Sequence, residues 1–190
     1  MRFGLRWIIG TLLVAAIVVG CISAGLWQLR RLDERRRTNE QVRSRSSDVV
    51  DLPVEGFTAA AEDALLFRRV RVTGEYEPEN ELLVRFRSRK GLPGFEVVTP
   101  FATDDGVVLV NRGWVPLDVG ERWPDPQAAP PTGEVTIEGL LGHAESGPVR
   151  VSGRVVARID PPRLAAAARA GDRPVYALPL LATAATDAFP

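Results

Sequence analysis

The sequence predicts a membrane-anchored, mainly β protein: an N-terminal transmembrane helix followed by a small antiparallel β barrel or sandwich with one short helix. The first observation is an uncharged apolar run over residues 7–29. The second is a series of short segments after residue 69 in which apolar and polar residues alternate, as in half-buried strands. We therefore divide the chain into four parts: an N-terminal tail (1–6), a transmembrane helix (7–29), a juxtamembrane helix extension (30–45) and a β domain (46–190).

The apolar run has the length and the ends of a membrane-spanning helix. About 20 apolar residues cross the hydrocarbon core of roughly 30 Å, and Trp7 and Trp27 stand near the two ends, where indole rings favour the headgroup region. No Pro or Gly follows until well past Arg37, so we expect the helix to continue to between Thr38 and Arg43. The arginines of this extension form either a charged interfacial collar or a contact site for anionic lipid or an acidic partner.

Cys21 permits a second interpretation of the N-terminus. The run is too long for a cleaved signal peptide, but Val18-Val19-Gly20-Cys21 is similar to a lipoprotein processing site. Against lipidation, the chain remains apolar for several residues after Cys21, so we interpret this cysteine as a small apolar residue of the membrane helix.

Composition excludes several classes of function. The net charge is zero, which removes the general basic field expected of a nucleic-acid-binding protein. The chain has one His, one Cys and one Met, too few for a soft-metal site, and no Gly-rich phosphate loop. Catalysis by a Ser-His-Asp or Cys-His arrangement would need His143 as the base. We therefore expect a protein that is not an enzyme and binds no metal.

Strand patterns fill the β domain. Residues 69–77 and 134–141 alternate clearly, and in 82–87 the same period places Leu82, Val84 and Phe86 on one face. Residues 107–110 are apolar on both faces and predict a central strand after a turn at 104–106. We expect further strands over 95–101, 149–159 and 175–180, a loop over 88–94, a surface connection over 117–131, and an Ala-rich helix from Asp160 to just before Gly171.

Four segments together resemble the surfeit-locus protein 1 family. In chain order they are Gly25-Leu26-Trp27-Gln28-Leu29-Arg30, then Phe67-Arg68-Arg69-Val70 with Gly74-Glu75-Tyr76, then Gly94-Phe95-Glu96-Val97-Val98-Thr99-Pro100, and Leu109-Val110-Asn111-Arg112-Gly113-Trp114-Val115-Pro116. No single segment is decisive, but four in the same order, with weaker similarity further along, cover most of the chain.

The resemblance implies an assembly factor for haem-copper cytochrome c oxidase, assisting haem a placement or maturation of the catalytic subunit. It implies transient contact with haem a, and as partners the oxidase catalytic subunit, other assembly factors and the lipid bilayer. It also implies a bacterial plasma membrane with the soluble domain on the extracytoplasmic side. The positive-inside rule opposes that topology, because more arginines follow the span than precede it.

One feature of the family plan is missing from this sequence. The family has two membrane helices, whereas no second apolar run near twenty residues follows Tyr176. We expect either a truncated or divergent sequence or the loss of that helix. The family's proposed haem-contact histidine belongs to the missing helix, so none is named here, and we interpret His143 as a polar loop residue.

The resemblance supplies two sets of site residues. As contacts for the partner or haem it implies Trp27, Gln28, Arg30, Arg68, Asn111, Arg112 and Trp114; as residues of the structural motif, Gly25, Gly74, Tyr76, Gly94, Thr99, Pro100, Gly113 and Pro116. Arg112 would hold a haem propionate or an acidic loop of the oxidase, or instead pair with Glu96 or Glu75. Trp114 would face a porphyrin or lipid, or belong to the core.

A second class of function fits the same sequence. A membrane-anchored extracytoplasmic binding module or lipoprotein, without a role in oxidase assembly, would need the same anchor and β domain. Lipid attached at Cys21, together with normal oxidase in cells without the protein, would distinguish it from an assembly factor.

Overall fold

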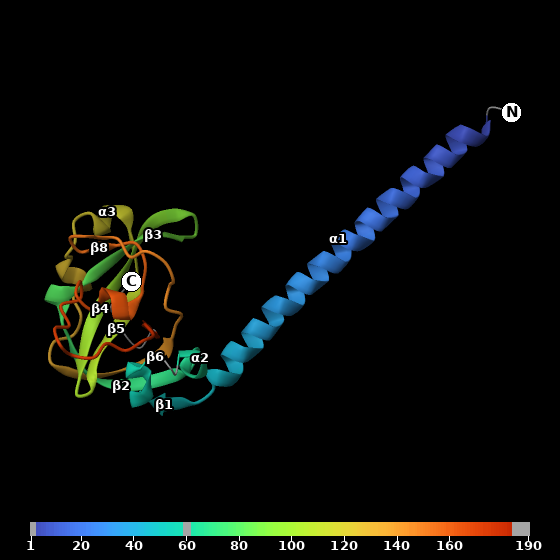
Figure 1. Cartoon of the computed structure of the whole chain (residues 1–190). Helices are drawn as coiled ribbons and strands as arrows, with labels where there is room; N and C mark the ends of the chain where they lie inside the picture. The colour runs from blue at the N-terminus through green and yellow to red at the C-terminus, as the bar shows by residue number, and fades with distance from the viewer. Residues whose placement is uncertain (1–2, 59–61, 184–190) are drawn as a thin grey trace. The chain divides into compact units, whose positions relative to one another are not determined.

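A computed structural model describes residues 3–58 and 62–183 (Figure 1). The chain divides into two compact units, residues 1–44 and residues 45–190, which we describe separately. The first unit is a single helix and the second is a mainly β domain, as the sequence predicts.

Helix α1 (Phe3–Arg45) is continuous over 43 residues. Its segment Trp7–Asp33 is the one helix among the described residues that is long and apolar enough to cross a membrane. The helix continues through the arginine-rich extension because Leu, Arg, Glu and Gln are good helix formers and no Pro or Gly interrupts them. It ends at Arg45, the last residue of the predicted juxtamembrane extension and two residues beyond the range from Thr38 to Arg43.

The β domain contains nine strands, all hydrogen-bonded into one sheet of the described residues. Their order is β1-β2-β6-β9-β5-β4-β3-β8-β7, and an additional pairing joins β2 to β4, so that β2, β6, β9, β5 and β4 form a closed circuit. The strands are β1 (Val49–Asp51), β2 (Arg69–Tyr76), β3 (Leu82–Arg89), β4 (Leu92–Thr103), β5 (Gly106–Pro116), β6 (Glu134–Leu141), β7 (Val151–Ser152), β8 (Val155–Val156) and β9 (Leu180–Ala182).

Short helices connect these strands. Helix α4 begins directly after Asp160, as predicted, but its α-helical part ends at Leu164 rather than near Gly171. Other single turns lie in the segments that the sequence treats as connections. The helical elements of this unit are η1 (Val54–Phe57), α2 (Glu62–Leu65), η3 (Pro78–Asn80), α3 (Leu117–Gly120), η4 (Pro126–Ala128) and α4 (Pro161–Leu164).

Three expectations about the strands are corrected. The sheet is not purely antiparallel, because β1–β2, β3–β8 and β5–β9 pair in parallel. Residues 88–94 are not a loop: β3 and β4 continue as a hairpin whose turn residues, Lys90 and Gly91, both have positive φ. The last strand is displaced from 175–180, since Val175 forms only an isolated bridge and the strand begins at Leu180.

Strand β5 separates the two main clusters of the core. Val108 and Val110 pack into one cluster with Tyr176 and Leu180, whereas Val107 and Leu109 pack into the other. Successive side chains of a strand point to opposite faces, so a strand that is apolar at every position has to be covered on both sides. The predicted central strand is therefore confirmed.

Phe86 does not lie where the period of two places it. The pairing of β3 with β4 shifts register between Val84 and Arg87, and Phe86 has a φ of 63°. This bulge leaves Leu82, Leu83 and Val84 buried but makes the Phe86 side chain 77% exposed. A bulge re-aims one side chain, which simple alternation cannot predict.

Gly74 lies where β2 leaves β6 and meets β4. Gly74 pairs with Val135, and the next residue, Glu75, already has Ala102 of β4 among its partners. A Cβ atom at Gly74 would lie 2.0 Å from the Ala102 carbonyl oxygen. The crossing therefore requires glycine, as the structural interpretation of Gly74 expects.

Candidate functional site

The Asn111-Arg112-Gly113 segment forms a β-bulge in β5. Val98 pairs with Asn111 and Val97 pairs with Gly113, so Arg112 is the extra residue. The Gly113 N–H donates a hydrogen bond to Asn111 Oδ1 (3.0 Å), and Gly113 has a φ of 135°. An amide side chain and a glycine thus build the bulge locally, and the bulge sets the direction of the arginine between them.

Arg112 forms a buried ion pair with Glu81. Arg112 Nη2 donates to Glu81 Oε1, Arg112 Nε donates to Thr99 Oγ1 (2.8 Å), and the Thr99 hydroxyl donates to Glu81 Oε1 (2.7 Å). The side chains of Arg112 and Glu81 are only 1% and 3% exposed. The ion pair that Arg112 forms is with Glu81; of the two predicted partners, Glu96 pairs with Arg87.

Two aromatic side chains complete this network. Trp123 Nε1 donates to Glu81 Oε2 (3.1 Å), which ties the 117–131 connection to the carboxylate. The guanidinium carbon of Arg112 lies 5.9 Å from the Tyr76 ring centroid. Burial raises the pKa of Tyr76 to about 12, although the charge of Arg112 opposes that rise. We call Glu81, Thr99, Arg112 and Trp123 the interior network.

Sequence reasoning missed Glu81 and Trp123. Glu81 follows η3 and directly precedes three buried residues. An unpaired carboxylate would be costly there, and this position is the one signal that could have indicated that Glu81 has a buried partner. Thr99, predicted as a structural motif residue, is fully buried, and Pro100 beside it accepts a backbone hydrogen bond from Glu77 (2.9 Å).

Trp114 is half-buried and lies against Gly94. A Cβ atom at Gly94 would lie 2.6 Å from Cε2 and Cζ2 of the indole and 2.1 Å from the Val115 carbonyl oxygen. The Trp114 indole N–H is buried and has no hydrogen-bond partner among the described residues. Gly94 therefore provides the space for this ring, and Pro116 ends the strand in an exposed position.

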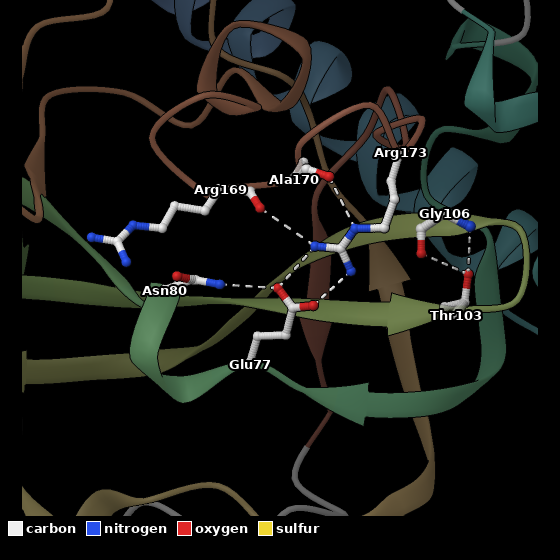
Figure 2. A network of polar contacts seen from close by, with 7 residues as sticks. All are labelled: Glu77, Asn80, Thr103, Gly106, Arg169, Ala170 and Arg173. Atoms are coloured by element: carbon white, nitrogen blue, oxygen red, sulfur yellow. Dashed lines mark hydrogen bonds and ion pairs between the residues drawn. The ribbon is translucent and has the colours of Figure 1, made fainter.

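A second network fastens the segment after α4 to the β2–β3 connection (Figure 2). Arg173 Nη1 and Nη2 donate to the two carboxylate oxygens of Glu77 at 2.6 and 3.1 Å, and Arg173 Nε donates to the Ala170 carbonyl (2.9 Å). Hydrogen bonds from Arg173, opposed by partial burial and helped by Asn80, lower the pKa of Glu77. Figure 2 shows the guanidinium enclosed by these acceptors.

The comparison with known families matches most of this architecture. A model described as the SURF1 family matches residues 15–188, which includes most of the apolar helix and nearly all of the β domain. The chain belongs to the SURF1 family. The resemblance found in the four sequence segments is thereby confirmed.

Known SURF1-like proteins are similar over part of their length. An uncharacterised SURF1-like protein of Mycobacterium bovis is 36% identical over 145 residues, covering 73% of this chain and 52% of that protein. SURF1-like proteins of Caenorhabditis briggsae and Rickettsia felis are 27% identical over 169 residues and 34% identical over 97 residues, with 52% and 40% of their lengths covered. The chain spans about half the length of the curated relatives it matches.

Three predicted SURF1 contact residues and one motif glycine lie on α1. Trp27, Gln28 and Arg30 are exposed, and the Arg31 guanidinium lies 5.5 Å from the Trp27 ring centroid. Gly25 is open on the helix surface, because a Cβ atom there would contact nothing within 4 Å. These side chains are available to lipid or to a partner helix.

Arg68 is the exposed contact candidate of the β domain. It directly precedes β2, and its carbonyl accepts a hydrogen bond from the Leu141 N–H (2.9 Å), which fixes its backbone while leaving the side chain in solvent. The structure thus brings Asn111, Arg112 and Trp114 together on β5 and leaves Arg68 outside that group.

The surroundings of Arg112 and His143 bear on contact with haem. The Arg112 side chain is buried and engaged by Glu81 and Thr99, so it cannot reach a propionate at the surface. His143, the one histidine of the sequence, is exposed and packs edge-to-face with Phe67, with ring centroids 5.2 Å apart. From these two side chains we assign no resident haem site.

Proposed function

We propose that the protein is an assembly factor for haem-copper cytochrome c oxidase that assists haem a placement or maturation of the catalytic subunit, and is not an enzyme. The observation that supports this most directly is the SURF1 family match over residues 15–188, which spans both the apolar helix and the β domain. We further propose that the helix anchors the protein in a bacterial plasma membrane with the β domain on the extracytoplasmic side.

The geometry supports a docking role. The five-strand circuit, which we interpret as a small barrel, and the interior network fix the strands, and the Arg112–Glu81 pair of that network is buried. In this proposal the protein holds the catalytic subunit, with other assembly factors, in a state that accepts haem a. Its own contact with haem a would be transient, because Arg112 is committed to Glu81.

The test is a deletion strain complemented with the full-length protein. We expect cells without the protein to lose assembled haem-a oxidase while other membrane enzymes persist, and the wild-type chain to restore it. A pull-down of the full-length membrane form should capture oxidase subunits, and its absorption spectrum should report any bound haem. Normal oxidase in the deletion strain would refute the proposal.

The alternative function depends on Cys21. This cysteine is free and exposed on α1, in the sequence context that is similar to a lipoprotein site. Incorporation of labelled lipid that disappears in the Cys21→Ser variant, together with normal oxidase in the deletion strain, would favour an anchored binding module or lipoprotein.

The side of the membrane can be tested in the same strain. A cysteine placed at exposed Ser152 in the Cys21→Ser background should react with a membrane-impermeant thiol reagent in intact spheroplasts. Reaction only after lysis would place the β domain on the cytoplasmic side, as the positive-inside rule favours.

A further inference from the structure

The β3–β4 hairpin and the segment 148–158 together form a surface rich in arginine. A groove of about 440 Å³ is lined by residues that include Arg85, Phe86, Arg150 and Arg158. The hairpin, labelled β3 in Figure 1, adds Arg89, Lys90 and Leu92 near its turn. We call these seven residues the basic hairpin surface.

The charge of this surface is unbalanced. With Arg87 it contains six basic residues, whereas the carboxylates that pair with these are only Glu96 and Glu145, so the local net charge is +4 in a chain whose total is zero. Both carboxylates are committed to Arg87, which donates to Glu96 Oε2 (2.8 Å) and to both oxygens of Glu145 (2.7 and 2.8 Å). None of the other five forms an ion pair within the described residues.

Two apolar side chains project among these charges. Phe86 is 77% exposed and Leu92 is 61% exposed, although both belong to strands of the domain. The Arg85 guanidinium lies 4.5 Å from the centroid of the Phe86 ring. A positive φ is rare for a bulky residue, and such backbone strain is concentrated at sites that contact ligands.

We propose that the basic hairpin surface docks the β domain onto anionic phospholipid of the bilayer. Arginine and lysine attract anionic headgroups, while an exposed aromatic ring and a leucine enter the interfacial region, so both components of the surface match one occupant. The apolar span of α1 tethers the domain to a membrane, which gives even a weak surface contact a high effective concentration. The inference depends on the tether and the surface, and does not depend on the role in oxidase assembly.

The experiment places a reporter beside the surface in the full-length protein. In a Cys21→Ser background, Ser88→Cys, on the hairpin, is labelled with an environment-sensitive fluorophore and the protein is reconstituted into vesicles. In phosphatidylcholine containing phosphatidylglycerol, the label should shift to shorter wavelength and be quenched by spin-labelled lipid. In phosphatidylcholine alone, or at high salt, it should remain in water. The same label at exposed Thr132 serves as the positional control.

Substituted variants distinguish the effect of the basic hairpin surface from the effect of the total charge of the domain. Arg85→Gln, Arg150→Gln and Arg158→Gln combined should reduce the docking equilibrium on the order of 100-fold, because each basic residue near an anionic membrane contributes about a fivefold factor. The matched control replaces three arginines of other elements, Arg71, Arg122 and Arg169, and should leave docking unchanged.

Two outcomes would overturn the proposal. A label that stays in water on anionic vesicles would exclude lipid, and shielding of that label only after addition of purified oxidase would indicate an acidic protein partner instead. An equal loss of docking in the control triple variant would show that total charge, rather than this surface, attracts the domain.

Discussion

Arginines of β5 and β3, the two strands that pair with β4, have opposite environments in the interior network and at the basic hairpin surface. On β5, Arg112 is enclosed with Glu81, and a threonine hydroxyl occupies its Nε. On β3, Arg85 and Arg89 form no ion pair among the described residues, and the Arg85 guanidinium lies 4.5 Å from the ring centroid of exposed Phe86. The two sites differ in whether a glutamate lies near the arginine. An arginine that pairs with a glutamate links strands of the fold, whereas the charge of an arginine without such a pair is available to a partner.

Three arginines that pair with glutamate differ in how exposed they are to solvent. The exposed fraction of the arginine side chain rises from 1% in Arg112 to 23% in Arg87 and 39% in Arg173, and each arginine has a glutamate partner. Solvent weakens an ion pair, whereas breaking a buried pair leaves a charge that water cannot reach. The cost of removing the arginine should therefore fall in the same order.

The largest effect is expected for Arg112→Met. It leaves the Glu81 carboxylate buried with only Thr99 and Trp123 as donors, and we expect a loss of about 3–5 kcal/mol in the free energy of unfolding. Denaturant unfolding of the full chain in detergent, followed by near-ultraviolet circular dichroism, measures this. The near-ultraviolet signal includes Trp123, which belongs to the network.

A double variant distinguishes the charge from the packing. Arg112→Met combined with Glu81→Leu removes both charges, so it should recover a large part of the stability lost by the single variant. If Arg112→Met alone costs less than about 1 kcal/mol, the arginine is not committed to Glu81 and the contact role predicted for it regains support.

Much of the strand structure could be predicted because it follows local alternation. β2 and β6 begin and end close to the predicted residues, since their polar faces meet solvent and their apolar faces meet one core. The two-sided burial of 107–110 was equally visible, because no polar residue interrupts that run. The family motif implied a structural role for Gly113, which has a φ of 135°, but it implied a contact role for Asn111, whose side chain instead accepts a hydrogen bond from the Gly113 N–H.

The partners of Arg112 could not be predicted from the sequence. Glu96 and Glu75 lie on or near the strands that alternation pairs with β5, but Glu81 reaches Arg112 only because η3 and the bulge bring both side chains inward. The exposure of Phe86 depends on another bulge, between Val84 and Arg87. A bulge changes the direction of a side chain by adding a single residue, and the alternation of apolar and polar residues does not indicate where this happens.

An intermediate effect is expected for Arg87→Gln. This arginine donates to two glutamates, and its loss should lower the free energy of unfolding by about 2 kcal/mol, since hydrogen bonds between charged groups contribute about 1.5–3 kcal/mol each. The matched control is Arg89→Gln on the same strand, which should change stability by less than about 0.5 kcal/mol. Equal effects of the two substitutions would contradict the assigned pairing.

A smaller and pH-dependent effect is expected for Arg173→Gln. Hydrogen bonds from Arg173 hold the pKa of Glu77 below its ordinary 4.5, so this pair adds stability above pH 4.5 and loses it as the pH falls through the folded value. Because Arg173 is partly exposed, we expect a loss of about 1 kcal/mol at pH 7. Thermal unfolding at pH 7 and at pH 3 should show the difference from wild type shrinking in acid; a constant difference would contradict the ionic contribution.

The smallest effect on stability is expected for Phe86→Gly. Glycine accepts the φ of 63° without strain, which offsets its greater loss of backbone entropy, and the ring it removes is mostly in solvent. The free energy of unfolding should change by less than about 1 kcal/mol, whereas docking of the Ser88→Cys reporter on anionic vesicles should weaken. A loss above about 2 kcal/mol would mean that the ring serves the fold. Unchanged docking would show that Phe86 does not contribute to lipid binding, and the proposed surface would then consist of its basic residues and Leu92.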